Sequence, residues 1–290
     1  KSTINFAESM ETVFEDIREV SPTLFYGVPR IYEKINSNFN IALSEATNLS
    51  KFIYERALKT SLQRVEFKMK NKKIPLTLTI RFFMYEFFVF RNLRRMIGFD
   101  RVKRAVTGAA PISPDLVKWF NALGIPLIEG YGMSETATVM TMNDPENNKV
   151  GTVGSWVPDA NVKISPEGEI QWKSPAVFAG YYKDNKRTSE AFTKDGYFKT
   201  GDKGKIEDGL LSITGRLKDI IITAGGKNIS PALIENYLKF SKYISDAIVI
   251  GDQRKYLTAL ILIDQENVEK FAQQNRIQYS DFSSLCNASE

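Results

Sequence analysis

The stretch EGYGMSET, residues 129–136, places a tyrosine between two glycines and follows it with acidic and hydroxyl side chains. Its Gly132-x-Ser134 segment is similar to the start of the G-x-S-x-G turn that presents a nucleophilic serine in hydrolases. Thr136 stands where the last glycine of that turn belongs, and the chain contains no histidine to act as a base. Because a serine without a base lacks its usual means of activation, this turn must serve another chemistry.

The side chains of this turn suit a phosphate-bearing ligand. Glycines let backbone amides approach a ligand closely, and such amides favour anions. The ring of Tyr131 is suited to lie against a flat partner such as a purine. Glu135 and Thr136 offer hard oxygen atoms that suit Mg²⁺ and hydrogen bonding to a phosphate.

Two later glycine loops carry charged side chains of the same kind. Asp202 lies in YFKTGDKG, where a carboxylate can accept the two hydroxyls of a ribose, and Arg216 lies in TGRLKD, where it can donate to sugar or phosphate oxygens. Taken alone, an aspartate in such a turn is more often a simple turn former, and an arginine at a strand end is more often a surface charge.

A strand–helix–strand pattern positions the first of these loops. Residues 101–111 (RVKRAVTGAAP) read as a strand ending in a glycine loop, and residues 125–132 (IPLIEGYG) read as the next strand. The helix between them begins at an N-cap, Ser113, and ends at Gly124. This pattern predicts a parallel sheet, whose ligands bind beyond the carboxyl ends of the strands. We therefore expect the two glycine loops to lie side by side.

The rest of the chain predicts an α/β protein with two domains. Residues 8–75 show helical spacing with a turn at Tyr26–Arg30, and residues 151–209 show short strands typical of a small antiparallel sheet or distorted barrel. Residues 216–290 predict a small α+β domain, incomplete at its end, with a helix over 231–240 and strands over 246–252 and 257–264. The expected boundary divides residues 1–215 from residues 216–290.

Composition limits the compartment and the class of site. Hydrophobic residues make up 43% and charged residues 25%, as in an ordinary globular protein. One cysteine, Cys286, cannot form an internal disulfide, which indicates a reducing compartment such as the cytoplasm. One thiol and no histidine exclude a structural zinc site. The chain shows no secretory signal, and its first and last residues read as an excerpt of a longer protein.

A basic, aromatic-rich segment, residues 51–104, carries a net charge of +11. Its six aromatic residues between Phe82 and Phe90 lie in a stretch too short and too charged to cross a bilayer. The preferred interpretation is a core helix with a solvated basic face. The alternative is a patch that contacts an anionic membrane peripherally. No nucleic-acid partner is expected, because no RRM, KH or zinc-finger pattern accompanies the charge.

Three motifs, in this order, resemble the signature motifs of the adenylate-forming enzymes: EGYGMSET, DGYFKTGD and GRLKDIIITAGGKNISP. Weaker similarities extend over essentially the whole chain, through PTLFYGVPRIYEKI, VFRNLRRMIGFDRVKRAVTGAAPISPDL, EGEIQWKSPAVFAGYY and AIVIGDQRKYLTALILID. Within that superfamily, the segments VPRIYEKI and AGGKNISP resemble the corresponding motifs of the long-chain fatty acyl-CoA synthetases.

This resemblance implies a two-step ligase reaction that uses ATP, Mg²⁺ and coenzyme A. A fatty carboxylate attacks the α-phosphate of ATP to give an acyl-adenylate and pyrophosphate, and the thiol of coenzyme A then displaces AMP. Tyr131 would stack on adenine, Thr136 would contact the α-phosphate and Glu135 would hold Mg²⁺. The other residues of the implied nucleotide site are Gly108, Ala109, Ala110, Glu129, Gly130 and Gly132.

The resemblance also implies roles for the later motifs. Asp202 would hold the ribose hydroxyls with the help of Arg216. Lys218 would be the hinge about which the small domain rotates between the half-reactions. After that rotation, the coenzyme A arm would be approached by Gly225, Gly226 and Lys227.

Two parts of the family pattern are not found in this chain. The phosphate loop is expected before residue 1, and the late catalytic lysine is expected after residue 290. We therefore expect this chain alone not to adenylate, while keeping weak nucleotide affinity. Two alternatives stay open: a ligase for another carboxylic acid, such as an aryl or amino acid, and a noncatalytic module that binds nucleotide or acyl-CoA.

Overall fold

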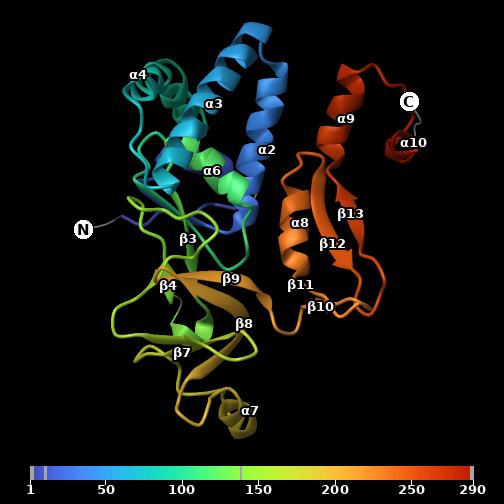
Figure 1. Cartoon of the computed structure of the whole chain (residues 1–290). Helices are drawn as coiled ribbons and strands as arrows, with labels where there is room; N and C mark the ends of the chain where they lie inside the picture. Colours follow the sequence, from blue (N-terminus) through green and yellow to red (C-terminus); the bar gives the residue numbers. More distant parts are fainter. Residues whose placement is uncertain (1–2, 10–11, 138, 288–290) are drawn as a thin grey trace.

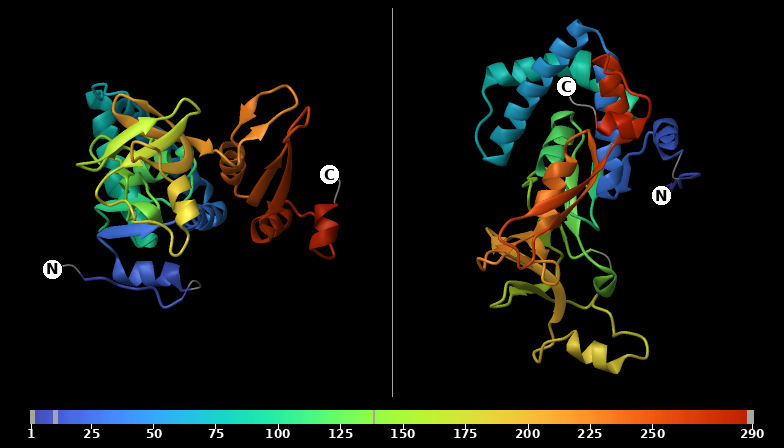
Figure 2. Two further views of the ribbon diagram at one scale, coloured as in Figure 1. Left: turned by 90° about the horizontal axis from the view of Figure 1, so that it is seen from below. Right: turned by 90° about the vertical axis from the view of Figure 1, so that its right-hand side faces the viewer.

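The structure is a computed structural model that describes residues 3–9, 12–137 and 139–287. It contains a helical layer, a five-stranded mixed sheet, a four-stranded antiparallel sheet and a small C-terminal domain (Figures 1 and 2). The expected α/β class is confirmed. In Figure 1 the helical layer lies above the two sheets, and the C-terminal domain stands beside them.

The helical layer comprises α1 (Val13–Val20), α2 (Pro29–Glu45), α3 (Asn48–Met69), α4 (Leu76–Tyr85), the π-helix η1 (Glu86–Phe90) and α5 (Arg91–Met96). Its inner faces share one hydrophobic core with the sheet. Aromatic rings dominate the centre of this core, where Tyr32, Phe90, Phe99 and Phe120 are fully buried. Tyr32 also donates a hydrogen bond of 3.1 Å to the carbonyl of Val106, which ties α2 to the sheet.

The mixed sheet has the order β1 (Leu24–Gly27), β2 (Arg104–Thr107), β3 (Leu127–Tyr131), β4 (Thr141–Met142) and β5 (Ser155–Trp156). The first three strands are parallel, and β4 and β5 are antiparallel to their neighbours. Strand β1 corrects the expectation that Tyr26–Arg30 is only a turn. A segment of only four residues close to a proline is too short to show the alternating pattern of a strand. It forms β1 because it pairs with β2 from Leu24 to Gly27.

The predicted strand–helix–strand unit is confirmed by β2, α6 (Pro114–Ala122) and β3. Helix α6 buries Leu116, Val117 and Phe120 against the core. It ends at Gly124, which has a φ of +79° and donates to the carbonyl of Asn121 while Ile125 donates to that of Phe120. This pair of bonds closes the helix end and requires the left-handed conformation that glycine adopts without strain. Ser113 occupies the N-cap position, but its hydroxyl makes no capping bond.

The antiparallel sheet has the order β6 (Asn161–Ile164), β7 (Glu169–Lys173), β8 (Phe198–Glu207) and β9 (Leu210–Arg216). This sheet, an open half-barrel, confirms the expected small antiparallel sheet or distorted barrel. A short helix, α7 (Asn185–Glu190), precedes β8. The pairing shifts register between Lys203 and Gly204, a bulge that bends the long strand β8.

The C-terminal domain comprises β10 (Ile221–Ile222), β11 (Asn228–Ile229), α8 (Pro231–Lys239), β12 (Ile244–Ile250), β13 (Thr258–Ile263), α9 (Gln265–Gln274) and α10 (Phe282–Cys286). The predicted helix and the two predicted strands of this domain are confirmed. Strands β12 and β13 pair antiparallel, and α8 packs on β12.

The structure confirms only part of the interpretation of the basic segment, residues 51–104, as a core helix. Phe82 and Phe90 are buried, whereas Phe83, Phe87 and Phe88 are exposed. The prediction was wrong for these outer rings because aromatic residues occur on both sides of the helix, and only one side can face the core. Within the described residues, every helix falls short of the length and apolar character that a membrane span needs.

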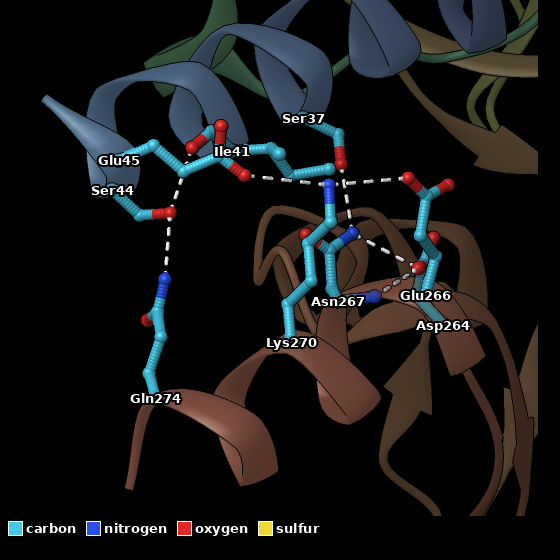
Figure 3. A network of polar contacts seen from close by, with 9 residues as sticks. All are labelled: Ser37, Ile41, Ser44, Glu45, Asp264, Glu266, Asn267, Lys270 and Gln274. Carbon is cyan, nitrogen blue, oxygen red and sulfur yellow. Dashed lines mark hydrogen bonds and ion pairs between the residues drawn. The ribbon is translucent and has the colours of Figure 1, made fainter.

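Helix α9 is docked on α2 by polar contacts, which set where the C-terminal domain stands (Figure 3). The amide nitrogen of Asn267 donates to Ser37 Oγ at 3.0 Å, and that of Gln274 donates to Ser44 Oγ at 3.1 Å. Lys270 lies 3.9 Å from the carboxylate of Glu45. Hydrogen bonds of this kind contribute about 1 kcal/mol each, so the docking is modest and reversible.

Removing the two hydrogen bonds from the α2 side is expected to loosen this docking. For Ser37→Ala with Ser44→Ala, a loss of about 2 kcal/mol predicts a roughly 30-fold larger undocked population. The measurement is the rate of tryptic cleavage after Lys218, between β9 and β10. Gln273→Ala, an exposed neighbour of Gln274 on α9, is the control and should leave the rate unchanged. Equal rates for the double variant and the unmodified chain would contradict this role of the contact.

Candidate functional site

The loops after β2 and β3 lie side by side, as expected, because the two strands are parallel neighbours. A side chain on Gly108 would bring its Cβ to 2.9 Å from the carbonyl oxygen of Gly130. The close approach of these two backbones therefore requires glycine at Gly108. Ala109 follows with a φ of +68°, a conformation that costs energy for a residue with a side chain. Ala109 and Ala110 are exposed at the end of the sheet.

The turn after β3 forms a short 3₁₀ helix, η2 (Ser134–Thr136), in which the hydroxyl side chain of Thr136 is buried. Thr136 is 1% exposed; its Oγ1 donates to the carbonyl of Met133 at 3.1 Å and accepts from the backbone N–H of Met133 at 3.3 Å. Ser134 is exposed. The expected contact between Thr136 and a phosphate stays a prediction, but in this conformation the accessible hydroxyl of the turn belongs to Ser134.

Glu135 is held by a tyrosine that the sequence analysis did not select. Tyr181 donates its hydroxyl to Oε1 of Glu135 at 3.1 Å, and the guanidinium of Arg187 lies 4.0 Å from the centroid of the Tyr181 ring. Burial and the hydrogen bond to Glu135 raise the pKa of Tyr181, so its hydroxyl stays a donor. The backbone N–H of Phe178 also donates to the carbonyl of Glu135 at 2.8 Å. Tyr181 lies in the AGYY stretch, which gave no direct sign of this contact.

Two residues that the sequence predicted for the site, Tyr131 and Arg216, donate hydrogen bonds to the carboxylate of a third, Asp202. Asp202 accepts a 2.7 Å hydrogen bond from the hydroxyl of Tyr131 on Oδ2, and a 3.0 Å bond from Nε of Arg216 on Oδ1. Asp202 and Arg216 are register partners on β8 and β9. Each oxygen of a carboxylate can accept a further hydrogen bond, so Asp202 keeps some capacity for a ligand although it is only 5% exposed.

Tyr131 joins the mixed sheet to the half-barrel. Its ring packs against the small apolar cluster of Val153, Ile170 and Leu211. Burial, and then the negative charge of Asp202, raises the pKa of Tyr131, so the phenol stays protonated and keeps donating. The hydrogen bond to Asp202 restricts the ring to one direction, which would reduce the entropy lost when a flat ligand stacks on it.

Glu129 adds a partly buried titratable group to the same strand, β3. Its Oε1 accepts from the backbone N–H of Gly151 at 3.2 Å, and burial raises its pKa to about 7. Two buried hydroxyls flank the same strand: Thr107 is the register partner of Glu129, and Thr141 is the register partner of Tyr131. Among the described residues, neither hydroxyl has a hydrogen-bond partner.

Mg²⁺ fits this site only together with a nucleotide. Among the described residues, no group of three or more acidic, histidine or cysteine side chains lies close enough to bind a metal by itself. Mg²⁺ usually binds through one or two carboxylates, and phosphates and water supply the remaining oxygen ligands. Glu135, oriented by Tyr181, is suited to be such a single carboxylate ligand.

The predicted coenzyme A residues lie on the turn between β10 and β11, in the C-terminal domain (Figure 1). Gly225, Gly226 and Lys227 are exposed, and Gly226 has a φ of +77°. A Cβ at Gly226 would meet no atom within 4 Å, so glycine is needed there for its conformation rather than for space. Lys218 is exposed just after β9. The roles of these four residues stay predictions.

Comparison with protein families gives two matches along the chain. Residues 2–182 match the family described as AMP-binding enzyme, and residues 218–281 match the AMP-binding enzyme C-terminal domain. The chain is also 37% identical over 277 residues to the long-chain-fatty-acid–CoA ligase FadD15 of Mycobacterium bovis. That alignment covers 95% of this chain and 45% of the relative, so the chain spans about half the length of the curated relative that it matches.

Solved structures show the same fold. The adenylation domain of a carboxylate reductase from Mycobacterium chelonae matches with a TM-score of 0.68 at 22% identity, covering 93% of this chain and 39% of that chain. The ATP-bound MatB of Rhodopseudomonas palustris matches with a TM-score of 0.52 at 30% identity, covering 64% of this chain and 41% of that chain.

Proposed function

Because this chain belongs to the AMP-binding enzyme family, we propose that it is the nucleotide-binding part of a ligase that joins a long-chain fatty acid to coenzyme A. The observation that carries the proposal is the convergence of Tyr131 and Arg216 on Asp202, directly beside the glycine loops after β2 and β3. The choice of a long-chain fatty acid is supported by the name of FadD15, which aligns with 95% of this chain.

The proposed reaction needs positioning and charge neutralisation rather than a general base. In the first step the fatty carboxylate attacks the α-phosphate of ATP and pyrophosphate leaves. In the second, the thiol of coenzyme A attacks the acyl carbonyl and AMP leaves. Charge at the phosphate is best stabilised by fixed donors and by a metal ion, and neither requires a histidine.

Each side chain of the site has a role that its geometry supports. Tyr131, restricted by its hydrogen bond to Asp202, stacks on adenine. Asp202 accepts the ribose hydroxyls, and Arg216 keeps its carboxylate oriented. In the turn after β3, Thr136 contacts the α-phosphate once its Oγ1 leaves the carbonyl of Met133, and Ser134 offers a second, exposed hydroxyl beside it.

Glu135 holds Mg²⁺ in this proposal, with Tyr181 fixing the direction of its carboxylate. When bound with the nucleotide, the ion neutralises phosphate charge and polarises the reacting phosphate. The loop at Gly108 lies along the purine and ribose in this proposal, and its glycine lets it approach the loop after β3, because a side chain there would meet Gly130.

We place the domain boundary near Gly215 and propose that the C-terminal domain rotates about Lys218. Residues 1–215 would form the last part of the large AMP-binding domain, and residues 216–290 would form the start of the small mobile one. A rotation would carry the exposed Gly226 turn toward the adenylate for the second step, and the modest docking of α9 on α2 supports such mobility. Closure of this kind excludes water from a reactive intermediate.

We also propose a cytoplasmic location, with peripheral membrane contact through residues 51–104. The free, exposed thiol of Cys286 supports a reducing compartment. Long hydrocarbon chains partition into bilayers, so an enzyme that activates them gains access to its substrate at a membrane surface.

The first test is calorimetric titration of this chain with a nonhydrolysable palmitoyl-adenylate analogue in the presence of Mg²⁺. Stacking of a base on an aromatic ring contributes about 2 kcal/mol, so Tyr131→Ala should weaken binding about 30-fold. The matched control is Tyr182→Ala, which removes an exposed tyrosine. A folded chain that binds no analogue, or an unchanged affinity for Tyr131→Ala, would contradict the proposed site.

Two companion titrations decide between the proposal and its alternatives. Tighter binding of a benzoyl- or aminoacyl-adenylate analogue would indicate a ligase for another acid. A noncatalytic module would bind palmitoyl-CoA at least as tightly as the adenylate analogue, whereas an enzyme binds analogues of its reactive states most tightly.

A further inference from the structure

The continuous helix formed by α4 and η1 has an apolar stripe that faces away from the core. The stripe, named here the outer stripe, consists of six large apolar side chains that are 54–74% exposed: Leu76, Ile80, Phe83, Met84, Phe87 and Phe88. Their spacing of three and four residues places them along one side of the helix. Scattered exposed apolar residues are ordinary, but a contiguous row of six on one helix marks an interaction surface.

The opposite side of the same helix explains why the outer stripe cannot turn inward. Leu78, Phe82 and Phe90 are buried, with Phe90 fully enclosed in the main core. Because these residues already pack against α3 and the sheet, a rotation that buried the outer stripe would expose them. The arrangement therefore has two apolar sides, of which the core needs only one.

The π-helical turn and one ion pair fix the end of the stripe. Arg94 pairs with Glu86 in η1 and also donates to the carbonyl of Leu123 at 2.7 Å, which ties η1 to the end of α6. Isolated π-helical turns in proteins occur frequently at functional sites. Phe87 and Phe88 are thus presented by an anchored part of the fold, directly after α4, which lies at the edge of the helical layer in Figure 1.

The charges around the outer stripe are predominantly positive. Arg81, Arg91 and Arg95 are exposed on the same continuous run of helix. The turn that leads into α4 adds the exposed Lys70, Lys72 and Lys73. The one acidic residue between Leu76 and Arg95, Glu86, is engaged by Arg94. A row of apolar side chains with a cationic rim is complementary to a surface that is apolar inside and anionic at its edge.

We propose that the outer stripe is a docking surface for an anionic phospholipid bilayer, on which the helix lies in the plane of the interface. The two phenylalanines of η1 and the aliphatic residues of α4 enter the boundary between head groups and acyl chains. The arginines contact lipid phosphates and hold the helix at that depth. This proposal deepens the peripheral membrane contact proposed above by naming its surface, and it rests on the exposed residues of this face rather than on the ligase chemistry.

The experiment is co-sedimentation of the chain with lipid vesicles, made either of phosphatidylcholine alone or with phosphatidylglycerol added. The unmodified chain should bind the anionic vesicles more tightly. Phe87→Glu with Phe88→Glu should weaken binding to them about 100-fold, because two buried rings are lost and two charges are introduced. The matched control is Leu49→Glu with Phe52→Glu, two exposed apolar residues of α3 outside the stripe, which should bind as the unmodified chain does.

A second variant tests the electrostatic part separately. Substituting glutamine for Arg81, Arg91 and Arg95 should weaken binding about 100-fold on anionic vesicles and little on neutral ones. Because all seven substituted positions, including the two of the control, are exposed, the variants should keep the circular dichroism and melting temperature of the unmodified chain.

Three results would overturn the proposal. The first is a folded, unmodified chain that does not sediment with anionic vesicles. The second is equal vesicle binding by the Phe87→Glu, Phe88→Glu variant and the control. The third is a chain that is dimeric in sedimentation velocity, becomes monomeric on Phe87→Glu with Phe88→Glu, and binds no vesicles; the stripe would then be an interface between two copies.

Discussion

Asp202→Ala is expected to weaken the folded state and the nucleotide site together. The substitution leaves the Tyr131 hydroxyl without its acceptor in a buried position and removes the partner of Arg216. Losing a hydrogen bond to a charged group costs about 2 kcal/mol, and the exposed Arg216 adds little because solvent screens its charge. We therefore expect the free energy of unfolding to fall by about 2 kcal/mol in urea titrations.

The same substitution should also lower the affinity for the palmitoyl-adenylate analogue, by more than the loss of binding that partial unfolding would cause. Without the carboxylate, the ribose hydroxyls lose their acceptor and the Tyr131 ring loses its fixed direction. Both effects weaken binding, and together we expect a loss of about 100-fold. Calorimetry under conditions in which the variant is fully folded separates this loss from unfolding.

Two further variants distinguish the hydrogen bond from the charge. Asp202→Asn keeps an acceptor for Tyr131, so it should recover part of the stability but not the affinity. Asp219→Asn removes an exposed carboxylate close in sequence and should change neither quantity. If Asp202→Ala bound the analogue as tightly as the unmodified chain, the carboxylate would have no place in the nucleotide site.

Glu129→Gln is expected to stabilise the chain at alkaline pH and to have little effect at acidic pH. Burial raises the pKa of Glu129 from 4.5 to about 7, so the folded state favours the protonated carboxyl. Below the unfolded-state value the group is neutral in both states and costs nothing. Between pH 4.5 and about 7 the unfolded chain releases a proton that the folded chain keeps, so stability falls by about 3 kcal/mol as the pH rises through this interval. Glutamine resembles the protonated form and avoids this loss.

The measurement is urea unfolding of both proteins at about pH 4 and about pH 8, on either side of the interval between the unfolded and folded pKa values. The unmodified chain should lose stability between the two conditions, and Glu129→Gln should lose less by about 3 kcal/mol. Glu190→Gln, at an exposed glutamate of α7, is the control and should follow the unmodified chain. A parallel fall for Glu129→Gln would show that another group causes the pH dependence.

Local patterns in the sequence determined much of the architecture. The apolar spacing, the glycine at position 124 and the alternation of strand and helix predicted α6 with its flanking strands, because helix ends and buried strands are set by neighbouring residues. The same holds for α8, β12 and β13. The glycine loops after β2 and β3 were expected side by side, since parallel neighbouring strands must end at the same edge of a sheet.

Only the tertiary structure decided which groups of the candidate site meet and which are accessible. The contact between Tyr131 and Asp202 joins residues on different sheets, and that between Tyr181 and Glu135 joins a loop to the turn after β3; both pairs are far apart in the chain. Whether Ser134 or Thr136 presents its hydroxyl depends on how the turn folds onto Met133. No local pattern encodes these distances.

Burial was likewise decided by packing rather than by residue type. The neighbours that the fold brings around Glu129 exclude water from its carboxyl and raise its pKa to about 7. Phe82 and Phe88 are both phenylalanines of one helix, yet one is in the core and the other faces outward. Sequence determined the kinds of side chain and their order, whereas the solvation of each one depends on neighbours that only the folded chain brings together.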